Sequence, residues 1–344
     1  MALSTLSTRC SPCFRCLLLE LEDDLLSIIF GQLCNPLEPR LAVALSSASR
    51  GLQALTQALR QQLKADHEAA AALCLKLGMR GSASLAELGM RSTFLPFRSC
   101  KELHEAKLIH WYDKGLSATD LATLGMLGSV LPALMALVLY NKPSGAPGAP
   151  GPSGVQRLVE GLGAGALPAV KMLSIGNFHM GDAGASALAA ALGQGALPRL
   201  EFLALNETAI GNAGLVALAP GLRRLPTLDV INLSNNPLGD EGLAALVAPP
   251  PPAGALPSPT CVLTKLKQLH LYNTQVTDAG CATLVSALHS GALPALEWLQ
   301  LGRTPASAAA KAFVHEVMEA SMAKRGGKIE SPSAHCGASW DVLQ

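Results

Sequence analysis

Residues 167–177 read LPAVKMLSIGN, and the fold of the chain follows from the recurrence of this stretch. Copies with the same Leu-Pro start stand at residues 131–141 (LPALMALVLYN), 197–207 (LPRLEFLALNE), 225–235 (LPTLDVINLSN) and 293–303 (LPALEWLQLGR). The central apolar positions are Leu137, Leu173, Leu203, Ile231, Leu269 and Leu299, at intervals of 36, 30, 28, 38 and 30 residues. Recurrence at such a period indicates a stack of similar structural units.

The two longest intervals contain insertions. They hold the segments PSGAPGAPGPSG and APPPPAGALPSP, whose proline and glycine residues cannot extend a helix. The other intervals are 28 and 30 residues, so these segments account for the longer spacing and the basic period is near thirty residues. A weaker first copy begins at Ile109, which lies 28 residues before Leu137.

Each unit predicts a short strand followed by a helix. In the unit quoted above, Val170, Leu173 and Ile175 form an L-x-x-L-x-L pattern whose alternate side chains point inward. Asp and Asn side chains accept hydrogen bonds from free backbone N–H groups at a helix start. We therefore expect helices to begin at four N-caps that are each followed two residues later by glycine: Asp182, Asn212, Asp240 and Asp278.

This pattern resembles the leucine-rich repeat family, in particular its ribonuclease-inhibitor-like subclass, over about residues 105–325. The family's hydrogen-bonding turn position holds Thr208, Asn236, Thr274 and Thr304, whereas Lys142 and Phe178 depart from the pattern. The resemblance implies an α/β fold, namely a curved solenoid with a parallel sheet on its concave face and helices on its convex side. It also implies that exposed strand positions bind a protein partner.

The outward strand positions of the predicted sheet are rich in aromatic and amide side chains. Tyrosine and tryptophan are enriched at protein interfaces because they bury a large area and keep a polar group. The alternative is a solvated strand face with incidental aromatic residues. The candidate partner-binding residues of the concave face are Tyr112, Tyr140, Phe202, Asn232, His270, Tyr272, Trp298 and Gln300.

Residues 21–33, LEDDLLSIIFGQL, precede the repeats and predict a separate helix. Asp23 and Asp24 favour a helix start, and Asn35-Pro36 ends the helix. Its apolar arc is wider than burial on one side needs, so we expect part of it to face another protein. The alternative is that residues 56–104 fold back and cover it. The apolar arc comprises Leu25, Leu26, Ile28, Ile29, Phe30 and Leu33.

Residues 20–55 resemble an F-box. The acidic pair, the leucine-rich helix, the proline break and a second helix in PRLAVALSSASR, anchored by Leu41, Leu45 and Leu52, follow the order of that motif. Glu22 stands where the family has proline, and Gly51 where it often has tryptophan. The resemblance implies that the apolar arc binds a Skp-family adaptor and that the chain is a substrate receptor of a cullin-RING ubiquitin ligase. Alternatives are a leucine-rich repeat scaffold or regulator with capping helices, or a GTPase activator of the Ran type.

The predicted organisation has five parts. They are a disordered N-terminus (1–19), the F-box-like motif (20–55), a helical linker region (56–104), the repeat solenoid (105–325) and a disordered tail (326–344).

Composition and motifs exclude several classes of function. Lysine and arginine number 26 against 25 acidic residues, a balance that provides no charged surface for nucleic acid. No Gly-rich phosphate loop, G-x-S-x-G or H-E-x-x-H motif occurs, so we expect neither an enzyme nor a cofactor. Residues 121–140 are uncharged over twenty positions, but they parse as the end of one unit and the start of the next, and we expect no membrane span.

The N-terminal cysteines bear on location and metal binding. Cys10, Cys13 and Cys16 lack the fourth ligand of a structural zinc site, so no metal is expected. Nine cysteines without a secretory signal favour a reducing compartment, the cytoplasm or nucleus. The N-terminus carries Arg9 and Arg15 without an acidic residue before Glu20, so an organelle transit peptide is an alternative.

Overall fold

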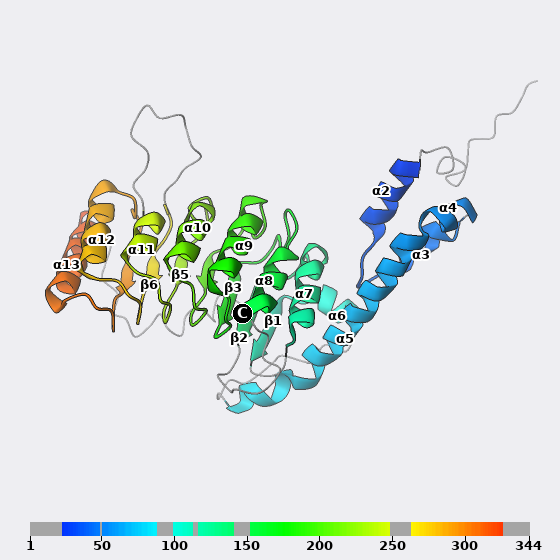
Figure 1. Ribbon diagram of the computed structural model, residues 1–344, viewed down its shortest axis with the longest axis horizontal. Coiled ribbons are helices and arrows are strands. Elements are labelled where there is room, and N and C mark those ends of the chain that lie inside the picture. Colours follow the sequence, from blue (N-terminus) through cyan, green and yellow to red (C-terminus); the bar gives the residue numbers. More distant parts are fainter. Residues whose placement is uncertain are drawn as a thin grey trace, which may run out of the picture.

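A computed structural model describes residues 23–48, 50–87, 99–112, 116–140, 152–247 and 263–325 (Figure 1). The predicted disordered ends, the N-terminal cysteines and both proline-glycine insertions lie largely or wholly outside these residues. The first elements are helices: α2 (Asp23–Leu33), α3 (Arg40–Ser46), α4 (Arg50–Leu55), α5 (Gln57–Glu87) and α6 (Cys100–His104).

Within the residues that the structure describes, seven strands then alternate with helices. The order is β1 (Leu108–Tyr112), α7 (Ala118–Met126), η1 (Leu127–Val130), β2 (Ala136–Tyr140), α8 (Pro152–Glu160), β3 (Met172–Gly176), α9 (Gly181–Gly193), β4 (Phe202–Ala204), α10 (Asn212–Leu222), β5 (Val230–Asn232), α11 (Asp240–Leu246), β6 (Gln268–His270), α12 (Asp278–Ser290), β7 (Trp298–Gln300) and α13 (Ala308–Lys324). The uncharged segment 121–140 is divided among α7, η1 and β2, as the repeat pattern predicted. Within the part of the chain that the structure describes, no helix combines the length and apolar character that a membrane span needs.

The strands form one parallel sheet in the order of the sequence, β1 to β7. The central apolar residue of each repeat pairs with that of the next across the whole sheet, for example Leu173 with Leu203 and Leu269 with Leu299. Helices α7 to α13 lie along the other side of the repeats (Figure 1). The predicted α/β solenoid with a preceding helical region is therefore confirmed.

The inward side chains of successive repeats build one continuous core. Leu203, Ile231 and Leu269 have no exposed surface, and they pack between the sheet and the helices with residues such as Leu218 and Leu284. Burying a leucine side chain contributes roughly 1.5 to 3 kcal/mol. The strand residues at this position, one in each repeat, therefore contribute to a core that runs through the whole stack.

The turn after each strand is held by buried polar side chains. The hydroxyl groups of Thr208, Thr274 and Thr304 each donate to the backbone oxygen three residues earlier, at 2.8 Å. Asn236 donates to the backbone oxygens of Leu205 and Leu233 and accepts from the N–H of Thr208. These bonds satisfy backbone groups that burial would otherwise leave without partners.

The predicted helix N-caps were wrong. The caps of α10, α11 and α12 are Gly211, Gly239 and Thr277, and that of α9 is Met180. The acidic and amide residues lie just inside the helices, and their side chains reach the next repeat instead. Backbone N–H groups donate to them across the repeat boundary: Gly211 to Asp182 (2.7 Å), Gly239 to Asn212 (2.6 Å), Thr277 to Asp240 (2.8 Å) and Ser307 to Asp278 (2.6 Å).

The glycine two residues further on makes room for this contact. A Cβ atom added to Gly214 would lie 2.5 Å from Oδ1 of Asp182, the carboxylate of the preceding repeat. At Gly280 the added atom would likewise collide with Oδ1 of Asp240. The recurring Asp-x-Gly sequence thus joins repeats to one another rather than capping single helices.

The N-terminal helices form two structural parts. Phe30, Ala42 and Leu63 make a small core that joins α2 and α3 to the first half of α5. Leu73 and Leu77, from the second half of α5, enter the main core with Leu103 of α6 and Ile109 of β1. Helices α5 and α6 therefore pack beside the first strand of the sheet, and α2 to α4 lie at the far end of α5, away from the repeats (Figure 1).

Candidate functional site: two partner-binding surfaces

The concave face presents two rows of side chains, and the strand register places the predicted residues in them. Phe202 of β4 and Trp298 of β7 belong to one row, which also contains Val230 and Gln268. Asn232, His270 and Gln300 are direct neighbours in the second row. The structure thus brings five of the eight predicted residues onto adjoining strands.

The other three predicted residues follow the same face toward the carboxyl ends of the strands. Tyr112 pairs with Tyr140 at the end of β1 and β2, and Tyr272 lies two positions after His270. The side chain of Tyr112 is outside the described residues. The remaining seven predicted side chains are each half-buried, so each still offers surface to a partner.

The first half of the concave face is more apolar than sequence reasoning indicated. Ala136, Val138 and Met172 form a buried cluster on this face, and Leu108 and Phe202 pack against it. The signal in the sequence is the strand ALVLY, which is apolar at every position and not only at alternate ones. The aromatic and amide residues therefore gather on β4 to β7.

His270 connects the polar residues of this second half. Its Nδ1 atom lies 3.0 Å from Oε1 of Gln300, and its Nε2 atom lies 3.4 Å from Oε1 of Gln268. Burial lowers the pKa of His270, and the hydrogen bond with Gln300 opposes that shift. A lowered pKa keeps the imidazole uncharged at neutral pH. The surface around it is accordingly neutral and able to form hydrogen bonds.

A column of turn residues borders the concave face. Asn235, Asn273 and Arg303 have positive φ values of 59°, 53° and 55°, which the tight turn after each strand requires. The amide of Asn273 donates to Asn235 at 3.0 Å, and that of Asn235 donates to Glu207 at 3.2 Å. The guanidinium of Arg303 stacks over the ring of Tyr272, 5.5 Å from its centre. Arg303 thus contacts Tyr272 at the rim of the sheet face.

The structure divides the six predicted adaptor-binding residues of α2 into two sets. Leu26 and Phe30 are buried, and Phe30 belongs to the small core that α5 completes through Leu63. Leu25 and Ile28 remain 46% and 59% exposed. The side chains of Ile29 and Leu33 are half-buried. Helices α3 and α4, together with Leu63 of α5, thus cover one side of α2 and leave the other open.

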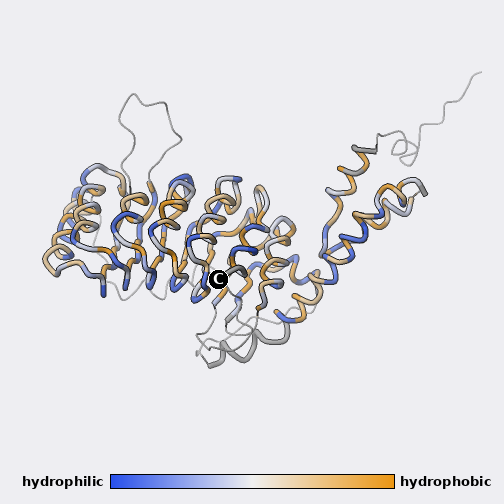
Figure 2. The backbone as a smooth tube through the Cα atoms, viewed as in Figure 1, coloured by the Kyte–Doolittle hydropathy of each residue, from blue (hydrophilic) through white to orange (hydrophobic). Residues whose placement is uncertain are grey.

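Two further large apolar residues are exposed on the neighbouring helix α3. Leu41 and Val43 of α3 are 65% and 48% exposed. Leu41 was expected to anchor the second helix in the core, and the structure contradicts that expectation, since Ala42 fills the inward position instead. Helix α2 is hydrophobic over most of its length (Figure 2). We call Leu25, Ile28, Leu41 and Val43 the N-terminal apolar surface.

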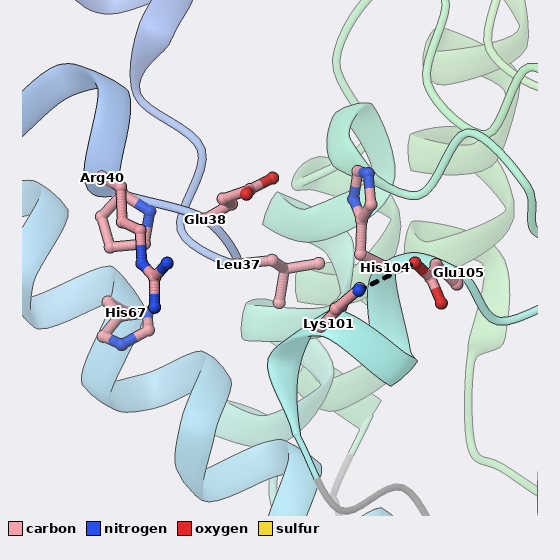
Figure 3. A pocket seen from close by; sticks show the side chains of 8 residues that line it. Leu37, Glu38, Arg40, His67, Lys101, His104 and Glu105 are labelled. Atoms are coloured by element: carbon pink, nitrogen blue, oxygen red, sulfur yellow. Dashed lines mark ion pairs between the residues drawn. The ribbon is translucent and has the colours of Figure 1, made fainter.

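A pocket of about 460 Å³ lies where the start of α3 meets α5 and α6 (Figure 3). Its lining mixes both signs of charge, including Arg40 and Lys101 against Glu38 and Glu105. Lys101 is paired with Glu105, and the ring of His104 contacts the backbone oxygen of Val130 at 2.8 Å. A mixed lining of this kind favours neither an anion nor a cation. Among the described residues, no group of three His, Cys, Asp or Glu side chains is arranged to hold a metal ion.

Comparison with known proteins supports the repeat fold. The family model described as "Leucine Rich repeat" matches residues 224–247, which include β5 and α11. A ribonuclease inhibitor from Sus scrofa is 39% identical over 84 residues, which are 24% of this chain and 16% of that protein. The solved structure titled "Leiomodin-1 Actin-Binding Site 2 (ABS2)" aligns with a TM-score of 0.34 and 15% identity over 50% of this chain and 90% of that one. The chain thus spans about one sixth of the inhibitor's length, and these residues show its similarity to leucine-rich repeat proteins.

Proposed function

We propose that this chain is a non-enzymatic binding protein that holds a protein partner against the concave surface of β4 to β7. The observation that carries the proposal is that half-buried Trp298 and Tyr272 stand on β7 and just after β6, the two neighbouring strands that also carry the hydrogen-bonded pair His270 and Gln300. Aromatic side chains framed by hydrogen-bonding groups are typical of the energetically dominant part of a protein interface. The name of the matched relative, a ribonuclease inhibitor, also denotes a protein that acts on a protein.

We further propose that the N-terminal apolar surface docks a Skp-family adaptor, which would make the chain a substrate receptor of a cullin-RING ubiquitin ligase. Four large apolar side chains are exposed on two neighbouring helices that lie away from the repeats. Amphipathic helices of this kind commonly insert into an apolar groove of a partner. In this proposal the chain acts in the reducing cytoplasm or nucleus.

A scaffold without an adaptor is the second candidate. It is favoured by the packing of α5 and α6 beside the first strand, where Lys76 forms a 2.7 Å ion pair with Asp120 of α7. That packing accounts for α5 and α6 as a cap of the solenoid. It does not account for the exposed residues of α2 and α3. Co-purification of the full chain with a Skp-family adaptor favours the receptor, and its absence favours the scaffold.

The concave surface is tested by paired alanine substitution. Tyr272→Ala with Trp298→Ala should lower the thermal midpoint by only about a few degrees, because neither side chain belongs to the main core. The double variant should weaken the binding of a partner by about 1 kcal/mol or more for each residue, which is the usual threshold for a dominant contact. The measurement is quantitative mass spectrometry of proteins captured from cell extract.

The matched control is Val216→Ala with Phe313→Ala, two exposed apolar residues on helices α10 and α13. This control should capture the same partners as the wild-type chain. Equal capture by the concave double variant and the wild type would remove β4 to β7 from the proposal.

A further inference from the structure

Two cysteines meet at the junction between the N-terminal helices and the repeats. Cys74 lies on α5 and is 3% exposed, and Cys100 is the first residue of α6 and is half-buried. Their Sγ atoms are 3.8 Å apart, which is van der Waals contact. Both side chains pack with the main core, Cys74 as a member and Cys100 at its border. Neighbours separated by 26 residues in sequence are thus held together by tertiary packing.

We propose that Cys74 and Cys100 are a site of oxidative modification, at which a hydroperoxide converts the two thiols into a disulfide. A disulfide has an S–S length of about 2.05 Å, so the sulfur atoms must approach by roughly 1.8 Å from their present contact. Side-chain rotation and a small shift of the short helix α6 can supply that approach. This inference is independent of the partners proposed above.

The exposure of the two thiols assigns their order of reaction. Cys100 is the thiol that solvent reaches, so its thiolate attacks a peroxide oxygen, the O–O bond breaks, and sulfenic acid and an alcohol or water form. The sulfur of Cys74 then attacks the sulfur of Cys100. The S–O bond breaks, and the hydroxyl leaves as water with the proton of Cys74. Two thiols are oxidised and one hydroperoxide is reduced, which balances the reaction.

The surroundings of Cys74 suit the second step. Burial, followed by the neighbouring Cys100, raises the pKa of the Cys74 thiol to about 12. A thiol with so high a pKa is protonated at neutral pH and reacts slowly with peroxide directly. It needs an activated sulfur within contact distance, which is what oxidised Cys100 would provide.

The bond would tie α5 to the helix that leads into β1. The N-terminal apolar surface is carried at the other end of α5, so the disulfide would fix the base of the element that connects this surface to the repeats. Closing a loop between residues 74 and 100 restricts the unfolded chain and should raise the thermal midpoint by a few degrees.

The test is peptide mapping of the reduced full-length chain before and after treatment with hydrogen peroxide. Trypsin releases each thiol in a separate peptide, ADHEAAAALCLK with Cys74 and SCK with Cys100. After alkylation without reductant, the expected product is the two peptides joined, with the loss of two hydrogens. Dithiothreitol should separate them again and return the thermal midpoint to its starting value.

Two variants and one control complete the test. Cys100→Ser and, independently, Cys74→Ala should each abolish the joined peptide and the rise in thermal midpoint. The control is Cys281→Ser, which replaces another buried free cysteine, on α12, and should leave both unchanged. The proposal is overturned if peroxide leaves both peptides separately alkylated, or joins Cys74 or Cys100 to other cysteines instead.

Discussion

At the scale of single residues, contacts between repeats depend on a carboxylate and a glycine in adjacent units. Asp240 accepts hydrogen bonds from both the backbone N–H and the hydroxyl of Thr277, and Gly280 leaves the space that its carboxylate occupies. The sequence showed the Asp-x-Gly recurrence but suggested helix capping, because a cap requires only local geometry. The contact across the repeat boundary depends on how two units stack, which one unit's sequence does not reveal.

This arrangement predicts coupling between Asp240 and Gly280. Gly280→Ala should lower the free energy of unfolding by about 1 to 3 kcal/mol through the collision of its new methyl group. Asp240→Ala should lower the free energy of unfolding by about 1 kcal/mol, because its hydrogen bonds with Thr277 are lost. In the double variant the cost of Gly280→Ala should shrink, because part of the obstacle is gone, although Val276 still crowds the site. Urea denaturation measures the free energy of unfolding of the wild-type chain, the two single variants and the double variant. If the effects of the two substitutions were strictly additive, the contact between Asp240 and Gly280 would be contradicted.

At the scale of secondary-structure elements, the junction between α5 and the repeats combines apolar packing with an ion pair. Lys76 of α5 contacts both carboxylate oxygens of Asp120 at 2.7 Å, and the hydroxyl and N–H of Ser117 bind the same carboxylate. Burial favours a higher pKa for Asp120, but the hydrogen bonds from Lys76 and Ser117 outweigh it and lower the pKa below the usual 3.8. Asp120 therefore stabilises α5 against α7 in its charged form.

A lowered pKa in the folded chain fixes the pH dependence of this junction. The stabilisation is complete above the pKa of the unfolded carboxyl and is lost as the pH falls through the lower, folded value. Asp120→Asn should therefore cost about 1 to 2 kcal/mol at pH 7, a figure reduced because Lys76 is half exposed. The difference in the free energy of unfolding between the wild-type chain and Asp120→Asn should become smaller below about pH 4. Denaturant titrations between pH 3 and pH 7 measure this difference. A difference that does not change with pH would exclude a role for the charge of Asp120.

At the scale of the whole molecule, the period of the sequence predicted the features that recur in every repeat. It did not predict contacts between segments that are far apart in the sequence. The row of leucines from Leu137 to Leu299 identified the sheet, since every unit must bury the same inward position. The division of α2 into a buried side with Phe30 and an open side with Ile28 depends on where α5 packs. The contact of Cys74 with Cys100 depends on the same packing. These features involve residues far apart in sequence, and no local pattern contains them.

Docking of a Skp-family adaptor on the N-terminal apolar surface, which we propose above, can be measured by calorimetric titration of the full chain with purified adaptor. Ile28→Asp should abolish binding, because it places a charge in the centre of the apolar contact. Leu75→Asp is the matched control: Leu75 is 54% exposed on α5, outside the surface, and its replacement should leave the affinity unchanged. For the wild-type chain and the control we expect a dissociation constant below roughly 10 μM, which corresponds to a binding free energy of about −7 kcal/mol. No measurable heat with the wild-type chain at tens of micromolar, or equal binding by Ile28→Asp, would contradict it.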